Sequence, residues 1–269
     1  MQGPQYAFTI DLGTILRQKF GKVPGFVVAF LRRLIHEDFL NEFFRRGWEG
    51  VDFADECLKY LDVTIRIEGL DNLDPSGRYT IASNHPLGGI DAIGLISEFG
   101  NYFHGDLKFQ VNDFLMYLKG LNSTFVPVNK TGRQSRELAL GTDAIFAAEG
   151  QIGVFPAGKV SRKIDGVIQD GPWTKTFIQK SVQFRRDIVP VHFYGRNSNR
   201  FYRVDRMAGW LGLNKKFPLA MILLPDELYK GQHKTYRIVV GKPIPWQTFD
   251  STRKPLEWAA WVREQAYNL

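Results

Sequence analysis

The chain has 269 residues, of which 44% are hydrophobic and 23% are charged, and its formal net charge is +7. This length fits one large α/β domain, and no linker rich in Pro, Gly or Ser divides the sequence. The positive charge suits an anionic partner such as a membrane surface, a nucleic acid or an acidic carrier protein. The single cysteine, Cys57, excludes an intrachain disulfide and a zinc cluster of cysteines.

Targeting signals are not apparent in the sequence. The N-terminus lacks the basic start, apolar stretch and cleavage site of a secretory signal. The most apolar stretch of the early chain, residues 25–34 (GFVVAFLRRL), is shorter than the roughly 18 residues that a transmembrane helix needs. We therefore expect the protein to be made and kept in the cytoplasm.

Residues 14–60 are predicted to be mostly helical. Large apolar residues alternate there with paired arginines, Arg32–Arg33 and Arg45–Arg46. This pattern is typical of amphipathic helices that either pack as a cap on a domain or lie in a membrane interface. The interfacial alternative is favoured by the aromatic residues Phe26, Phe30, Phe39, Phe43, Phe44 and Trp48. We accordingly divide the chain into a helical segment, residues 1–60, and a single α/β core, residues 61–269.

From residue 61 onward, predicted strands and helices alternate. Thr131 and Gln134 have the spacing of a capping box at the start of one of the helices. The alternation predicts an α/β fold in which a mixed sheet is flanked by helices. The expected strands span residues 62–70, 77–83, 123–128, 152–158, 188–195, 218–224 and 235–244. The expected helices span residues 91–100, 131–150, 175–187 and 254–268.

One strand-to-helix turn, SNHPLGGID at residues 83–91, carries both a base and an acid. A neutral imidazole at His85 can accept a proton from a hydroxyl, and Asp91 can orient it and stabilise the imidazolium. Gly88 and Gly89 allow the backbone to bend so that the two side chains converge. The alternative is a structural histidine that bonds to the turn, with Asp91 as an acid at a helix N-terminus.

A second polar turn follows the strand at residues 152–158. It carries Lys159, Ser161, Arg162 and Lys163, a set suited to a phosphate or carboxylate. The alternative is a solvated basic loop. The sequence contains no nucleophile-elbow serine, P-loop, dinucleotide-binding GxGxxG or set of metal ligands. These absences argue against a serine hydrolase, an ATPase, a dehydrogenase and a zinc enzyme.

Four segments in order, SNHPLGGID, FVPVNK, VFPAGKVSR and IVPVHFYGRNS, resemble the phospholipid/glycerol acyltransferase family. The resemblance covers about residues 60–200 and is greatest to a bacterial, hemolysin-like branch of lyso-aminolipid O-acyltransferases. Five residues, where the wider family has four, separate His85 from Asp91, and Ala157 replaces the usual glutamate. Lys130 stands where arginine is common.

The resemblance implies a glycerol-3-phosphate acyltransferase-like fold and transfer of a fatty acyl group from an acyl thioester to a lyso-lipid hydroxyl. It implies that His85 is the general base, that Asp91 orients it, and that no cofactor, metal or acyl-enzyme is needed. Asn84, Gly88 and Gly89 are oxyanion or turn residues. The residues expected to bind the acceptor are Lys130, Lys159, Ser161 and Arg162.

The implied partners are an acyl donor, on acyl carrier protein or coenzyme A, and an anionic membrane surface, without nucleic acid. The implied location is the inner face of the cytoplasmic membrane. For the acceptor, a lyso-aminolipid with a glycine, serine or ornithine headgroup is favoured over 1-acylglycerol-3-phosphate. An interpretation from another class remains open, in which the chain is a basic membrane- or RNA-binding protein without chemistry.

Overall fold

The computed structural model describes residues 6–127, 136–212 and 219–269. Its strands are β1 (Thr64–Glu68), β2 (Tyr79–Ser83), β3 (Leu107–Val111), β4 (Phe125–Pro127), β5 (Gln151–Val154), β6 (Arg162–Ile164), β7 (Val167–Gln169), β8 (Asp187–Tyr194) and β9 (Thr235–Val240). Seven of them form one sheet in the order β1-β9-β8-β2-β5-β3-β4, and β6 and β7 form a separate hairpin. Neighbouring strands are parallel except β8 and β9, so the predicted mixed sheet is confirmed.

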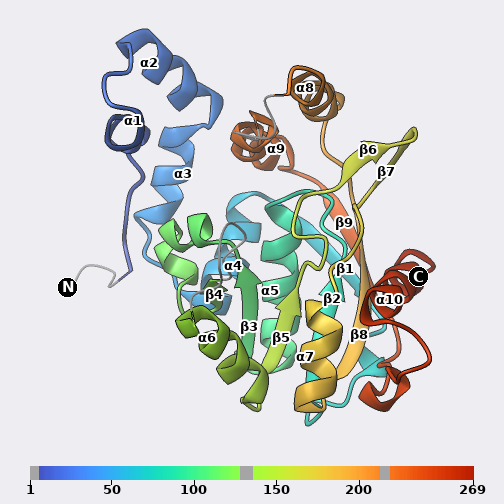
Figure 1. Cartoon of the computed structure of the whole chain (residues 1–269). Helices are drawn as coiled ribbons and strands as arrows, with labels where there is room; N and C mark the ends of the chain where they lie inside the picture. The colour runs from blue at the N-terminus through green and yellow to red at the C-terminus, as the bar shows by residue number, and fades with distance from the viewer. Residues whose placement is uncertain (1–5, 128–135, 213–218) are drawn as a thin grey trace, which may run out of the picture.

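Helices cover both faces of this sheet (Figure 1). The helices are α1 (Leu12–Phe20), α2 (Gly25–Leu34), α3 (Glu37–Phe44), α4 (Gly50–Tyr60), α5 (Ile90–Tyr102), α6 (Arg136–Ala147), α7 (Thr176–Phe184), α8 (Asn199–Trp210), α9 (Leu224–Lys230) and α10 (Pro255–Tyr267). Apolar side chains of α4 and α5 pack in one core cluster, and those of α6, α7 and α10 pack in another. Because β2 lies between β8 and β5 and is covered on both faces, each of its residues is buried.

The arrangement of β2, β5 and β8 positions the candidate site. These three strands are neighbours and parallel, so their carboxyl ends meet at one edge of the sheet. The turn that carries His85 follows β2, and Phe155 and Arg196 follow the other two strands. Side chains far apart in the sequence are therefore gathered at this edge.

The N-terminal helices stand at the same end of the molecule as α8, α9 and the β6–β7 hairpin (Figure 1). Phe43 and Phe44 of α3 are buried in the core, whereas α2 has no buried residue. Phe26 and Phe30 on α2 are 78% and 62% exposed. Among the described helices, none has the length and apolar character needed to cross a bilayer.

Several local predictions need correction. Residues 218–224 were expected to form a strand, but Leu219–Leu223 forms a 3₁₀ helix that leads into α9. An apolar run of this length fits either structure, and the early proline and first-turn acids of α9 favour a helix. The prediction that residues 14–60 are mostly helical is confirmed, and the helical residues are divided among four helices, α1 to α4. Strand β3, the β6–β7 hairpin and α8 were not predicted, and the Thr131–Gln134 capping box lies outside the described residues.

Candidate active site

His85 and Asp91 lie in direct contact at the carboxyl end of β2. The His85 Nδ1 atom is 3.0 Å from Asp91 Oδ2. The turn between them includes Gly88, whose φ of +82° is readily adopted only by glycine. The two side chains thus converge in the way that the spacing and the glycines predicted.

The Asp91 carboxylate is the centre of this turn. It is 0% exposed and lies in the first turn of α5. Its Oδ2 accepts hydrogen bonds from the Leu87 and Gly88 backbone N–H groups at 2.8 and 3.1 Å. Its Oδ1 accepts from those of Gly89 and Ala92 at 3.0 and 2.9 Å. The turn therefore folds around a buried carboxylate, and both structural and functional interpretations of Asp91 apply to the same group.

The protonation of Asp91 follows from these contacts. Burial by itself raises the pKa of the Asp91 carboxyl, but the charge and hydrogen bond of His85 and the Leu87 and Gly88 amides outweigh it. The net effect is a pKa below the usual range. Asp91 is consequently ionised at neutral pH and requires that His85 donate from Nδ1, which leaves Nε2 as the basic nitrogen.

Phe155 packs against one face of the His85 ring and holds it in place. The two rings stack with their centroids 3.9 Å apart and an interplanar angle of 20°. The His85 side chain keeps 16% of its surface exposed, and none of the contacts found in the described part of the chain uses its Nε2. An imidazole oriented in this way can, when neutral, abstract a proton from a hydroxyl through Nε2.

A second buried carboxylate, Asp170, lies behind the histidine and was not predicted from the sequence. Its Oδ1 accepts hydrogen bonds from the Ser161 hydroxyl at 2.5 Å and from the backbone N–H of His85 at 3.2 Å. Its Oδ2 accepts from Trp173 Nε1 at 3.0 Å. Burial raises the pKa of Asp170 above its ordinary value, although these donors oppose the increase. The motif QDGPW contains no spacing that would have linked Asp170 to His85.

The predicted acceptor-binding residues have different environments. Ser161 is 1% exposed; its hydroxyl bonds to Asp170, and its N–H donates to the His85 carbonyl at 2.7 Å. Arg162 Nε lies 2.9 Å from Asp205 Oδ1, so its charge has a partner. Lys159 is exposed, and Lys130 lies outside the described residues. Ser161 and Arg162 are thus engaged within the protein and support the turn.

The three predicted oxyanion or turn residues are also engaged. The Gly88 and Gly89 amides donate to Asp91. Asn84 is buried, and its side-chain amide exchanges two hydrogen bonds with the Phe193 backbone, at 2.6 and 3.0 Å. These contacts give all three residues a place in the turn and tie the turn to β8.

The side chain of Asn197 also holds the turn in place. Asn197 Nδ2 donates to the Pro86 and Leu87 carbonyl oxygens at 3.3 and 3.2 Å. A Cβ at Gly88 would lie 2.6 Å from Val160 Cγ2. Close packing and hydrogen bonds therefore fix the position of His85. In the described part of the chain, no group of three or more His, Cys, Asp or Glu side chains is placed to hold a metal ion.

Comparison with known proteins identifies the family to which the chain belongs. A family model described as acyltransferase matches residues 16–269. Two proteins named lyso-glycine lipid O-acyltransferase, from Bacteroides thetaiotaomicron and Phocaeicola vulgatus, are each 45% identical to this chain over 268 residues. The alignments cover 97% of this chain and 98% and 95% of the relatives. The crystal structure of the 1-acyl-sn-glycerophosphate acyltransferase PlsC from Thermotoga maritima superimposes with a TM-score of 0.48 and 16% identity, covering 95% of this chain and 86% of that chain. The match of the acyltransferase family model to nearly the whole chain, together with these relatives, shows that the chain belongs to the acyltransferase family.

Proposed function

We propose that this enzyme transfers a fatty acyl group from an acyl thioester to the hydroxyl of a lyso-glycine lipid or a similar lyso-aminolipid. The observation that carries the proposal is the His85–Asp91 pair, with Nδ1 bonded to a buried carboxylate and Nε2 left reachable. The acceptor class follows from the names of the relatives, which align over almost the whole chain. Because the chain is an acyltransferase, we set aside the alternative of a binding protein without chemistry.

The reaction follows from this pair as a direct transfer. The hydroxyl oxygen of the acceptor attacks the thioester carbonyl carbon while His85 Nε2 takes the hydroxyl proton. Asp91 stabilises the imidazolium that forms. Collapse of the tetrahedral adduct breaks the C–S bond, and the imidazolium returns its proton to the departing thiolate. The products are an ester and a free thiol, and His85 is neutral again.

We also propose that the enzyme binds peripherally to an anionic membrane at the inner face of the cytoplasmic membrane. The support is a set of exposed aromatic side chains on α2 and α8, two helices that stand at the same end of the molecule (Figure 1). Phe26 and Phe30 on α2 are exposed, and Trp210 at the end of α8 is 86% exposed. Aromatic side chains beside arginines such as Arg33 are typical of helices that lie in a bilayer interface. Loss of flotation with anionic vesicles in Phe26→Glu/Phe30→Glu would support this surface, and unchanged flotation would contradict it.

The catalytic proposal is tested by acyl transfer with purified wild type and His85→Ala. Labelled palmitoyl thioesters of carrier protein and coenzyme A would each be offered with lyso-glycine lipid, lyso-ornithine lipid and 1-acylglycerol-3-phosphate. We expect product from a lyso-aminolipid and a loss of about 100- to 10,000-fold in His85→Ala.

A second histidine supplies the control. His104 is exposed, has a φ of 53° and lies away from the turn. His104→Asn keeps a residue type that tolerates this backbone conformation and should remain fully active. Equal activity in His85→Ala and wild type would reject the proposed role of His85. Product only from 1-acylglycerol-3-phosphate would reject the proposed acceptor.

A further inference from the structure

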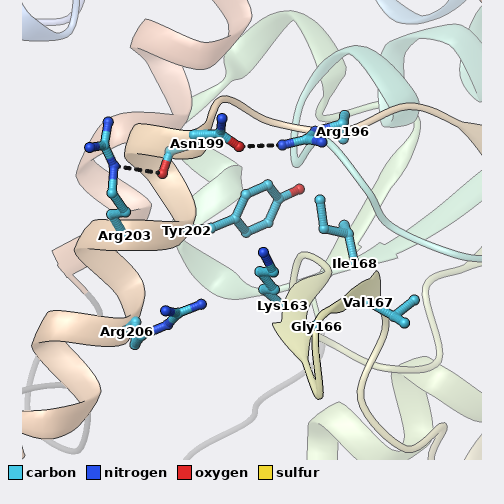
Figure 2. Close-up of a pocket in the computed structure, with 9 residues that line it drawn as sticks. All are labelled: Lys163, Gly166, Val167, Ile168, Arg196, Asn199, Tyr202, Arg203 and Arg206. Atoms are coloured by element: carbon cyan, nitrogen blue, oxygen red, sulfur yellow. Dashed lines mark hydrogen bonds between the residues drawn. The ribbon is translucent and has the colours of Figure 1, made fainter.

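A cationic pocket of about 750 Å³ lies between α8 and the β6–β7 hairpin. Figure 2 shows Tyr202, Arg203 and Arg206 on the helix, with Lys163 and Ile168 opposite them on the hairpin side. Arg196, from the loop after β8, completes the rim. Among the described residues that line the pocket, none is acidic. Four of the nine residues that line the pocket are therefore cationic.

Among the described residues, no acidic side chain forms an ion pair with any of these four side chains. Arg196 donates to the Asn199 side-chain oxygen, and Arg203 Nε donates to the Asn199 backbone carbonyl at 3.4 Å. Both acceptors are uncharged. None of the ion pairs found within residues 6–127, 136–212 and 219–269 involves Lys163, Arg196, Arg203 or Arg206. By contrast, the neighbouring Arg162 is paired with Asp205. Four cationic residues for which the described part of the chain shows no ion pair thus line one pocket.

Both walls of the pocket connect to the catalytic turn. On the helix side, the Tyr202 hydroxyl accepts a hydrogen bond from the Asn197 N–H at 3.1 Å, and Asn197 bonds to the Pro86 and Leu87 carbonyls. On the hairpin side, Lys163 follows Ser161 by two residues, and the Ser161 N–H donates to the His85 carbonyl. The pocket is therefore a neighbour of the His85 site and separate from it.

We infer that this pocket binds the phosphate of the pantetheine arm of the acyl donor. The inference rests on the proposed acyl transfer, in which the donor is a thioester on a carrier protein or coenzyme A. Both donors carry a phosphate that the pantetheine arm separates from the thioester, which fits a cationic pocket beside the catalytic turn. Arginine forks match phosphate oxygens, and Val167 and Ile168 offer an apolar wall to the arm. An N-acylated glycine acceptor carries one carboxylate and no phosphate, so it makes less use of four cations.

Steady-state kinetics of Arg203→Gln/Arg206→Gln tests the pocket. Both residues are exposed on α8, so the variant should fold as wild type does. Loss of charged hydrogen bonds to phosphate should raise the KM for the acyl donor about 10- to 100-fold. The KM for the lyso-lipid should not change. The control, Arg66→Gln/Lys242→Gln, removes the same net charge from exposed residues outside the pocket and should leave both KM values unchanged.

Direct binding separates this inference from the proposed reaction. Coenzyme A, pantetheine without phosphate and holo carrier protein would be titrated into His85→Ala, with and without the α8 substitutions. Binding that requires the phosphate and is lost with the α8 substitutions supports the pocket, even if no acyl transfer is found. Whichever of the two donors binds, coenzyme A or holo carrier protein, identifies the source of the phosphate. Binding of pantetheine as tight as that of coenzyme A would overturn the inference, because the phosphate would then contribute nothing. A raised KM for the lyso-lipid alone would overturn it in favour of a lipid headgroup.

Discussion

The His85 Nδ1 atom lies 3.0 Å from Asp91 Oδ2, and the same carboxylate accepts hydrogen bonds from four backbone N–H groups, three in the turn and one in α5. The Asp91 side chain thus organises the turn and orients the His85 ring. Such an arrangement couples folding to chemistry, because any change at Asp91 alters both the backbone of the turn and the charge next to the imidazole. The predictions below separate these two effects.

Asp91→Asn should lower kcat about 1,000- to 10,000-fold, because a neutral amide cannot stabilise an imidazolium at His85. It should also lower the free energy of unfolding by about 1–3 kcal/mol, since an NH₂ group would face backbone N–H donors. Acyl-transfer kinetics and urea denaturation measure the two effects. Wild-type kcat in a folded Asp91→Asn protein would contradict the proposed role.

The low pKa of Asp91 predicts acid sensitivity. The folded-state pKa is lower than the unfolded value of about 3.9, so the unfolded state binds more protons between the two. The stabilisation by Asp91 is therefore complete above about pH 4 and is lost as the pH falls through the folded-state pKa. The free energy of unfolding, measured against pH, should fall less steeply below pH 4 in Asp91→Asn than in wild type. If the free energy of unfolding fell equally steeply in both proteins, the Asp91 carboxylate would not be the source of the acid sensitivity.

Asp170 predicts the opposite dependence. Burial raises its folded-state pKa, so the folded protein binds the extra proton, and the free energy of unfolding falls as the pH rises from about 4 through the folded-state pKa. This decline should be absent from Asp170→Asn, whatever that substitution costs at a single pH. Chemical denaturation of both proteins at several pH values between about 4 and 7 tests the sign. A decline of equal slope in both proteins would contradict it.

Ser161→Ala distinguishes a structural serine from one that binds the acceptor. The hydroxyl bonds to buried Asp170, so its loss should lower the free energy of unfolding by about 1–3 kcal/mol and lower kcat through the displaced His85 backbone. The KM for the lyso-lipid should stay at its wild-type value. A specific increase in that KM, with stability unchanged, would instead support the binding role predicted from the sequence.

Gly88→Ala should destabilise the protein more than Gly105→Ala does. Gly88 and Gly105 have φ values of +82° and +86°, so alanine is strained at both. A Cβ at Gly88 would meet Val160 at 2.6 Å, whereas nothing lies within 4 Å at Gly105. The overpacking should add about 1–3 kcal/mol of destabilisation and reduce activity. Thermal melting and kinetics of both variants check this, and equal effects would show that packing at Gly88 is unimportant.

The contact between His85 and Asp91 was predictable because it is local. The two residues are six positions apart, two of the five residues between them are glycines, and the helix that begins at Ile90 fixes the direction of Asp91. The alternation of strands and helices likewise predicted a mixed sheet, since hydrophobic periodicity is written directly in the chain. The apolar run at residues 218–224 misled us because periodicity alone does not separate a short buried strand from a helical turn.

The sequence by itself determined that His85 and Asp91 meet, because that contact depends on neighbours within a few residues. It also indicated the mixed sheet, because the hydrophobic periodicity of each element is local. Only the tertiary structure brought Asp170 to the His85 backbone, since 85 positions separate them. The pairing of Arg162 with Asp205 and the cationic pocket of α8 and the hairpin have the same origin. The sequence shows which charged residues follow the strands. Whether each charged side chain forms an ion pair depends on residues that only folding brings into contact with it.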